Sequence, residues 1–253
     1  MIGAVRKASR GLARDFGEVQ ALQVSRKGAA DFVTNADLRV ENALFEELAK
    51  ARPGYGFLGE ERGEVEGTDK THRWIADPID GTTNFIHGMP HFAISLALER
   101  DGQIVAGVTF NPILNELFWA EKGRGAFLND TRIRVAARKE LIDSLIGTGI
   151  PWAGRPGHAQ FLKELHQIGQ RVAGVRRLGS ATLDLAWTAA GRYDGFWERN
   201  LQPWDVAAGI ILMSEAGGMT SAIDEGATAA SGASICAANL DLHPVLLERL
   251  RAA

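Results

Sequence analysis

The stretch that decides the fold, residues 74–85, reads Trp74-Ile75-Ala76-Asp77-Pro78-Ile79-Asp80-Gly81-Thr82-Thr83-Asn84-Phe85. Its first three residues form a short apolar run of the kind that makes a buried strand. Pro78 keeps the preceding Asp77 out of the helical region, so both acids are expected to leave the end of that strand together. The Gly81-Thr82-Thr83 turn that follows is expected to open a helix.

Two carboxylates beside the start of a helix predict a site for metal ions and phosphate. Free backbone N–H groups and the positive end of a helix dipole favour a phosphate oxygen at such a turn. The carboxylates of Asp77 and Asp80 would repel the same phosphate. Mg²⁺ resolves that conflict, because it prefers carboxylate and phosphate oxygens and can bridge them. An Asp-Pro or Asp-Gly dipeptide alone is ordinary loop punctuation, so the prediction depends on the whole stretch.

Length and composition are those of an ordinary globular protein, with 253 residues, 45% hydrophobic residues and a net charge of -3. A chain of this size can form one large domain or two closely packed ones. Its basic residues are scattered, so nothing indicates nucleic acid or an anionic membrane as a partner. The single cysteine, Cys236, fits a reducing compartment, and we expect a cytoplasmic protein. Neither a membrane-spanning apolar run nor a signal-peptide core is visible.

The first half of the chain predicts helices followed by strands. One amphipathic helix is expected from Ile2 to Val19, then a loop at residues 27–30 and a second helix, capped by Thr34-Asn35 and ended by Pro53-Gly54. Short strands are expected at residues 55–59 and 73–76, each followed at once by acidic residues. The spacing of turns then predicts an antiparallel meander with strands at residues 94–98, 104–108, 116–119 and 125–128.

The second half alternates strands and helices, as α/β layers do. Strands are expected at residues 145–149, 175–178, 196–197 and 234–237, and helices at residues 158–169, 182–190, 205–216 and 243–251. Residues 222–232 read as a loop of small residues. We place a boundary near residue 140, which divides one compact unit into an N-terminal α+β half, 1–140, and a C-terminal α/β half, 141–253.

Residues 74–85 resemble the inositol monophosphatase family, whose members carry an Asp-Pro-Ile-Asp-Gly-Thr-Thr-Asn-Phe segment that binds Mg²⁺ and the substrate phosphate. The resemblance covers nearly the whole chain, from the segment at Asp31 to Gly217-Gly218. It implies an α+β or α/β fold, the layered αβαβα sandwich of the inositol monophosphatase and fructose-1,6-bisphosphatase type. It also implies a homodimer.

The family's metal ligands match, in order and local context, Glu60, Asp77, the backbone carbonyl of Ile79, Asp80 and Asp205. Separate segments have to supply them, because adjacent acids on one element cannot surround a cation. Four carboxylates and a phosphate dianion carry about six negative charges, which two or three Mg²⁺ ions would offset. Each of these acids taken alone has a simpler interpretation. Glu60 could be a solvated acid at the end of a strand, and Asp205 could be an acid stabilised by the dipole at the start of a helix.

The resemblance implies that Thr82 orients the attacking water together with Asp37, and that Glu60 shares this water. Asp37 could instead be only an acid in the first turn of a helix. The substrate-binding residues that it implies are Gly81, Thr82, Gly179, Ser180, Ala181, Glu198 and Asp205, with the backbone of the first two holding phosphate oxygens. Glu198 beside Arg199 could equally be half of a surface ion pair.

The activity that the resemblance implies is Mg²⁺-dependent hydrolysis of a phosphate monoester of a small polyol, foremost myo-inositol 1-phosphate, by in-line attack of a metal-activated water. The segment Asp80–Phe85, together with Glu198, favours inositol phosphate. Fructose 1,6-bisphosphate, histidinol phosphate and other sugar phosphates stay open as substrates, since a fold does not settle the substrate. A role as a partner of the transcription machinery in ribosomal RNA synthesis also stays open, because a bacterial relative has one. Inhibition by Li⁺ is a further expectation.

Overall fold

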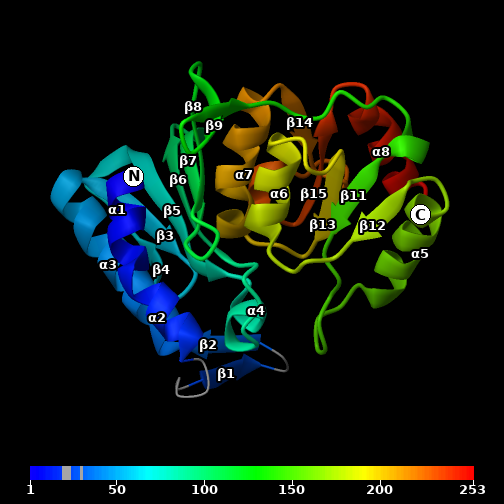
Figure 1. The fold of residues 1–253 in the computed structure, drawn as a ribbon. Coiled ribbons are helices and arrows are strands. Elements are labelled where there is room, and N and C mark those ends of the chain that lie inside the picture. Colours follow the sequence, from blue (N-terminus) through cyan, green and yellow to red (C-terminus); the bar gives the residue numbers. More distant parts are fainter. Residues whose placement is uncertain (19–23, 29–30) are drawn as a thin grey trace.

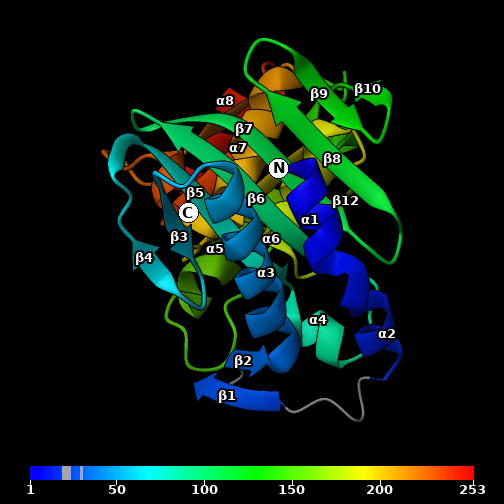
Figure 2. The ribbon, with the colours of Figure 1, turned by 90° about the vertical axis from the view of Figure 1, so that its left-hand side faces the viewer.

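Two β-sheets alternate with three layers of helices (Figure 1). This computed structural model describes residues 1–18, 24–28 and 31–253. The helices of the layers are α1 (Ile2–Ala8), α2 (Leu12–Gly17), α3 (Asn35–Ala51), α5 (His158–Gly169), α6 (Ala181–Ala189), α7 (Pro203–Glu215) and α8 (Leu242–Arg251). α1 and α3 cover the outer face of an eight-stranded sheet, α6 and α7 lie between the sheets, and α5 and α8 cover the far face of a five-stranded sheet (Figures 1 and 2). This αβαβα order confirms the predicted fold.

The eight-stranded sheet runs in the order β10-β9-β8-β7-β6-β5-β3-β4. Its strands are β3 (Tyr55–Gly59), β4 (Gly63–Val65), β5 (Asp69–Asp80), β6 (Ala93–Arg100), β7 (Gln103–Asn111), β8 (Glu116–Glu121), β9 (Gly125–Leu128) and β10 (Thr131–Ile133). From β5 to β10 each strand pairs antiparallel with the next, which confirms the predicted meander, and β3 pairs parallel with β5.

The five-stranded sheet runs in the order β12-β11-β13-β15-β14. Its strands are β11 (Leu145–Thr148), β12 (Gly174–Arg176), β13 (Gly195–Arg199), β14 (Gly218–Ser221) and β15 (Ser234–Asn239). A small hairpin of β1 (Val24–Gly28) and β2 (Asp31–Thr34) precedes α3. The predicted division at residue 140 falls between the two large sheets in sequence, but α7 of the second half packs on β7 of the first, so the two halves share one core. The division stays a prediction.

The structure differs from the sequence-based expectations in several places. The prediction of a single N-terminal helix is wrong, because a 3₁₀ turn at Ser9–Gly11 separates α1 from α2. Serine and glycine in this turn are poor helix formers. Its expected last residue, Val19, lies outside the described residues. The loop expected at residues 27–30 is wrong for 27 and 28, which end β1, while 29 and 30 lie outside the described residues. The edge strands β4, β10 and β14 and the hairpin of β1 and β2 were not expected.

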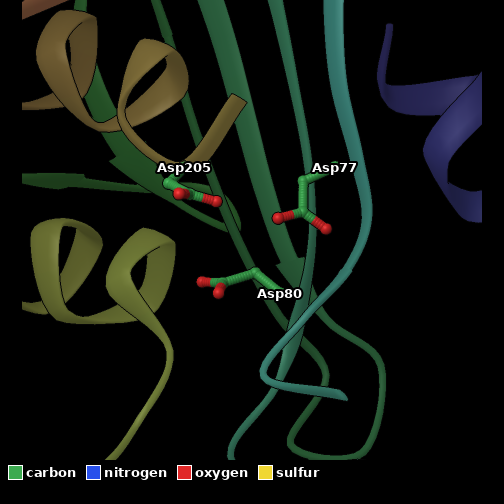
Figure 3. A group of neighbouring side chains, drawn as sticks. All are labelled: Asp77, Asp80 and Asp205. Carbon is green, nitrogen blue, oxygen red and sulfur yellow. The ribbon is translucent and has the colours of Figure 1, made fainter. Parts of the chain in front are cut away.

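The helix α7 approaches the eight-stranded sheet closely at Gly107. A Cβ atom added to Gly107 on β7 would come within 2.6 Å of Ile211 and 2.9 Å of the Cα of Ala208. Glycine is therefore needed at this position, because a side chain would push the helix away. The apolar residues of α7 are buried between the sheets, and the start of the helix lies beside β5 (Figure 3). In the described part of the chain, no helix combines the length and the apolar character needed to span a membrane.

Candidate active site

A β-bulge brings Asp77 and Asp80 to the same side of β5. Side chains of a regular strand alternate between the two faces, so residues three apart would point in opposite directions. In the pairing of β5 with β6, Asp77 lies opposite Ser95 and Asp80 opposite Ala93, so residues 78 and 79 share one opposite residue. The extra residue in β5 brings the side chains of Asp77 and Asp80 back to one face of the strand. Proline is tolerated at a bulge, and the strand that was expected to end at Ala76 therefore continues to Asp80.

Asp205 joins these two acids from the first turn of α7. Each of the three carboxylates offers an oxygen that lies within 4.8 Å of the others, and Figure 3 shows the three side chains converging between β5 and the start of α7. The Oδ2 atom of Asp205 accepts a hydrogen bond of 2.7 Å from the N–H of Gln202, which fixes the carboxylate at the helix start. Glu60, at the end of β3, lines the same pocket of about 340 Å³.

Burial and mutual repulsion raise the pKa of the acids in this cluster. Burial, and then the charges of Glu60, Asp80 and Asp205, raise the pKa of Asp77 well above its ordinary value. Burial and the charge of Asp80 raise the pKa of Asp205 to about 7. The Oδ1 atom of Asp77 is buried without a hydrogen-bond partner among the described residues. A cation would satisfy that atom and neutralise the repulsion, and an all-oxygen ligand set suits a hard ion such as Mg²⁺.

Three donors orient Asp80. Its Oδ2 atom accepts hydrogen bonds of 2.7 Å each from the Ser180 hydroxyl, the Thr182 hydroxyl and the Thr182 N–H. These donors lie at the start of α6, in the other half of the chain, and they leave Oδ1 as the oxygen for a cation. The resemblance assigns Ser180 to the substrate, whereas here it is buried and contacts Asp80; Gly179 and Ala181 line the pocket.

Thr82 and Asp37, predicted to act together, are brought within hydrogen-bond distance. Thr82 follows the bulge and begins the short helix α4 (Thr82–Ile86). Its hydroxyl lies 3.3 Å from Oδ1 of Asp37 and 3.0 Å from the carbonyl oxygen of Ile79. Asp37 is also the first-turn acid of α3, as the alternative interpretation had it, because its Oδ2 atom accepts from the N–H and hydroxyl of Thr34. Burial raises the pKa of Asp37 to about 6.

The remaining predicted residues lie at the other side of the pocket. Gly81 and Glu198 line it together with Gly179 and Ala181. Burial and neighbouring acids, first among them Asp184, raise the pKa of Glu198 well above its ordinary value. The neighbouring Arg199 pairs instead with Glu164 and Asp224, so the predicted alternative of a Glu198–Arg199 surface pair is wrong.

Among the residues that sequence reasoning missed are two arginines and one acid near the pocket. Arg155 and Arg177 line the pocket, and Arg155 stacks on the ring of Trp152 at 3.5 Å from its centroid. Asp184, on α6, is 1% exposed and lies 3.7 Å from Nε2 of His91. No motif marks these residues, because each comes from a segment whose local pattern is ordinary helix or loop.

The raised carboxyl pKa values predict how Mg²⁺ stabilisation depends on pH. A carboxyl with a raised pKa in the folded protein contributes most stability below its ordinary value of 3.8, and this is lost as pH rises through the folded value, about 7 for Asp205. The Tm of the metal-free protein should therefore fall from about pH 5 to about pH 8, and the rise in Tm on adding Mg²⁺ should be larger at the higher pH. Thermal unfolding with NaCl at matched ionic strength is the control for screening. A Mg²⁺ effect that is equal at both pH values contradicts this prediction.

A model of the inositol monophosphatase family matches residues 1–253. A relative from Caulobacter vibrioides, named inositol-1-monophosphatase, is 68% identical over 256 residues and is matched over 100% of both chains. A relative from Escherichia coli strain K12, named Nus factor SuhB, is 39% identical over 99% of this chain and 94% of its own. The crystal structure of the extragenic suppressor protein suhB from Bartonella henselae superposes with a TM-score of 0.95 at 53% identity, over 99% of this chain and 96% of that one.

Proposed function

This chain belongs to the inositol monophosphatase family and is a phosphatase, and we propose that it hydrolyses the phosphate monoester of a small polyol, foremost myo-inositol 1-phosphate, with Mg²⁺ as cofactor. The observation that carries the proposal is the convergence of Asp77, Asp80 and Asp205 on one point from segments more than a hundred residues apart in the chain. Glu60 and Ile79 line the same pocket, and the carboxylate of the first and the carbonyl of the second would complete the proposed ligand set for two or three ions. Burying a cluster of carboxylates that bound no cation would cost free energy of folding.

The proposed mechanism is in-line attack of water on phosphorus. Bound Mg²⁺ would supply an activated water and stabilise negative charge on the phosphoryl and leaving oxygens. In this chain, the Thr82 hydroxyl would donate a hydrogen bond to Asp37 and accept one from the attacking water, which directs a lone pair of that water toward phosphorus. Glu60 would share that water. Because the Thr82 hydroxyl carries one proton, this role requires the bond to Asp37 rather than the bond to the Ile79 carbonyl.

Substrate selection is proposed for the opposite side of the pocket. Gly81 and Thr82 would hold phosphate oxygens through their backbone, and Glu198, with Gly179 and Ala181, would contact polyol hydroxyls. A half-buried acid such as Glu198 that accepts hydroxyl hydrogen bonds disfavours esters that lack those hydroxyls, since the acceptor would stay unpaired. This chemistry fits an inositol ring and agrees with the name of the Caulobacter relative. Fructose 1,6-bisphosphate and histidinol phosphate are the alternatives within the family.

Phosphate release from a panel of esters tests this proposal. We expect the highest kcat/KM for myo-inositol 1-phosphate, no release with EDTA, and none from an Asp80→Asn variant with an unchanged circular dichroism spectrum. Preference for fructose 1,6-bisphosphate or histidinol phosphate would overturn the substrate assignment. Equal turnover with EDTA would overturn the role of Mg²⁺.

A second candidate function is binding to the transcription machinery, which the name of the Escherichia coli relative supports. Catalysis and such binding could coexist on one chain. No turnover of any ester by the folded protein would favour the binding role. We further propose a homodimer and inhibition by Li⁺ on the family resemblance, and a cytoplasmic location on the single buried cysteine, Cys236. Sedimentation and Li⁺ titration of the activity test the first and the last.

A further inference from the structure

A second buried acid, Glu41, lies on α3 one helical turn after Asp37. Residues four apart share one face of a helix, and the two side chains are 2% and 0% exposed. While Asp37 contacts Thr82, the Oε2 atom of Glu41 accepts a hydrogen bond of 2.9 Å from the backbone N–H of Glu61. One face of α3 thus contacts both the proposed water-orienting residue and the chain next to the proposed ligand Glu60.

The turn that carries Glu60 is held on two sides. Residues 60–62 connect β3 to β4. The N–H of Glu60 donates to the carbonyl of Ala76 on β5, and the next N–H donates to Glu41. These two bonds tie the turn to the strand that carries Asp77 and to the helix that carries Asp37.

Gly59 gives Glu41 the room for this contact. A Cβ atom at position 59 would lie 2.3 Å from Oε2 of Glu41 and 2.8 Å from its Cδ atom, closer than atoms can approach. The Glu41 carboxylate can therefore take this position only because residue 59 has no side chain. An apolar residue could fill the space at position 41 without the cost of burying a carboxylate. The acid is thus explained by its hydrogen bond, not by packing.

We propose that Glu41 is a positioning residue for the metal site: by binding the Glu61 N–H it fixes the turn that directs the Glu60 carboxylate relative to Asp37 and Thr82, and so raises the affinity for Mg²⁺. The inference rests on the proposed function. Residues that orient metal ligands typically change affinity by about 10–100-fold when they are removed.

The test compares Glu41→Met, which has no strong acceptor, with Glu41→Gln, whose amide oxygen can still accept from the Glu61 N–H. Glu46, exposed on the same helix, gives the matched control Glu46→Gln. In the metal-free protein, hydrogen exchange of the Glu61 amide should be faster in Glu41→Met only. Mg²⁺ binding by calorimetry should weaken about 10-fold or more in Glu41→Met and stay within about threefold in the other two. In turnover, the Mg²⁺ needed for half-maximal rate should rise while KM for the ester stays close to wild type.

Three results would overturn the proposal. Wild-type Mg²⁺ affinity in a folded Glu41→Met variant would show that the contact does not act on the metal site. Glu41→Gln behaving like Glu41→Met would show that the charge matters rather than the hydrogen bond. A Cβ atom at position 59 would also come within 2.6 Å of the Phe57 ring, so Gly59→Ala should displace both that ring and the Glu41 carboxylate. Wild-type Glu61 exchange and Mg²⁺ affinity in Gly59→Ala would contradict the steric link. Exchange and calorimetry need no substrate, so a failure of the proposed phosphatase substrate would be seen separately, as normal Mg²⁺ binding without turnover.

Discussion

Asp77→Asn should lower kcat by about 1000-fold or more while raising the Tm of the metal-free protein. Asp77 is the most buried acid of the cluster, and its pKa is raised by burial and by the charges of Glu60, Asp80 and Asp205. The amide of asparagine keeps the shape of the side chain but removes the charge that attracts Mg²⁺. The same change removes repulsion from the metal-free site, so stability and activity should move in opposite directions.

The measurements are kcat at saturating Mg²⁺ and thermal unfolding in EDTA at about pH 8, where the remaining acids are ionised most fully. Asp130→Asn, an exposed change between β9 and β10, is the matched control and should alter neither quantity. Retention of more than about a tenth of wild-type kcat would remove Asp77 from the proposed ligand set. A lower Tm in EDTA would show that Asp77 is a structural residue whose partners stabilise the fold.

Thr82→Ala should lower kcat by about 100- to 1000-fold with little change in KM or in Mg²⁺ affinity. The hydroxyl is proposed to act on the water in the transition state, whereas the backbone of residue 82, which the change keeps, is proposed to hold the phosphate. Thr82→Ser keeps a hydroxyl within reach of Asp37 and should retain most of the activity.

Asp37→Asn should cause a loss similar to that of Thr82→Ala, and the double variant should lose little more, because residues that act as one unit are not additive. Steady-state kinetics on the four proteins, with circular dichroism as the folding control, measure this. Multiplicative losses in the double variant would show that the two residues act independently. A raised KM with unchanged kcat in Thr82→Ala would assign the hydroxyl to ground-state binding instead.

The sequence predicted most of the large elements because their signals are local. The meander follows from its turn spacing, and α3 from the cap at Thr34, which the structure shows donating to and accepting from the first turn. The small edge strands β4, β10 and β14 have three or four residues, too few for a periodic pattern to emerge. The break at Ser9–Gly11 was masked by apolar residues that still fall on one helical face.

For the candidate site, too, the sequence predicted what depends on neighbouring residues, and not what depends on contacts between distant segments. The local pattern marked Asp77 and Asp80, the family resemblance added Asp205, and the structure brings the oxygens of all three together. How two acids three residues apart reach one face could not be derived from the pattern, because the bulge depends on pairing with β6. Glu41 and Asp184 escaped notice for a similar reason. Their significance comes from contacts across the chain, to Glu61 and His91.

The most direct measurement of the central claim is calorimetric titration of inorganic phosphate into the protein with Mg²⁺ and with EDTA. If divalent ions convert a repulsive cluster of carboxylates into a phosphate site, phosphate should bind with Mg²⁺ and show no detectable heat of binding in EDTA, and Asp77→Asn should abolish the Mg²⁺-dependent signal. Phosphate that binds equally well in EDTA would contradict the account.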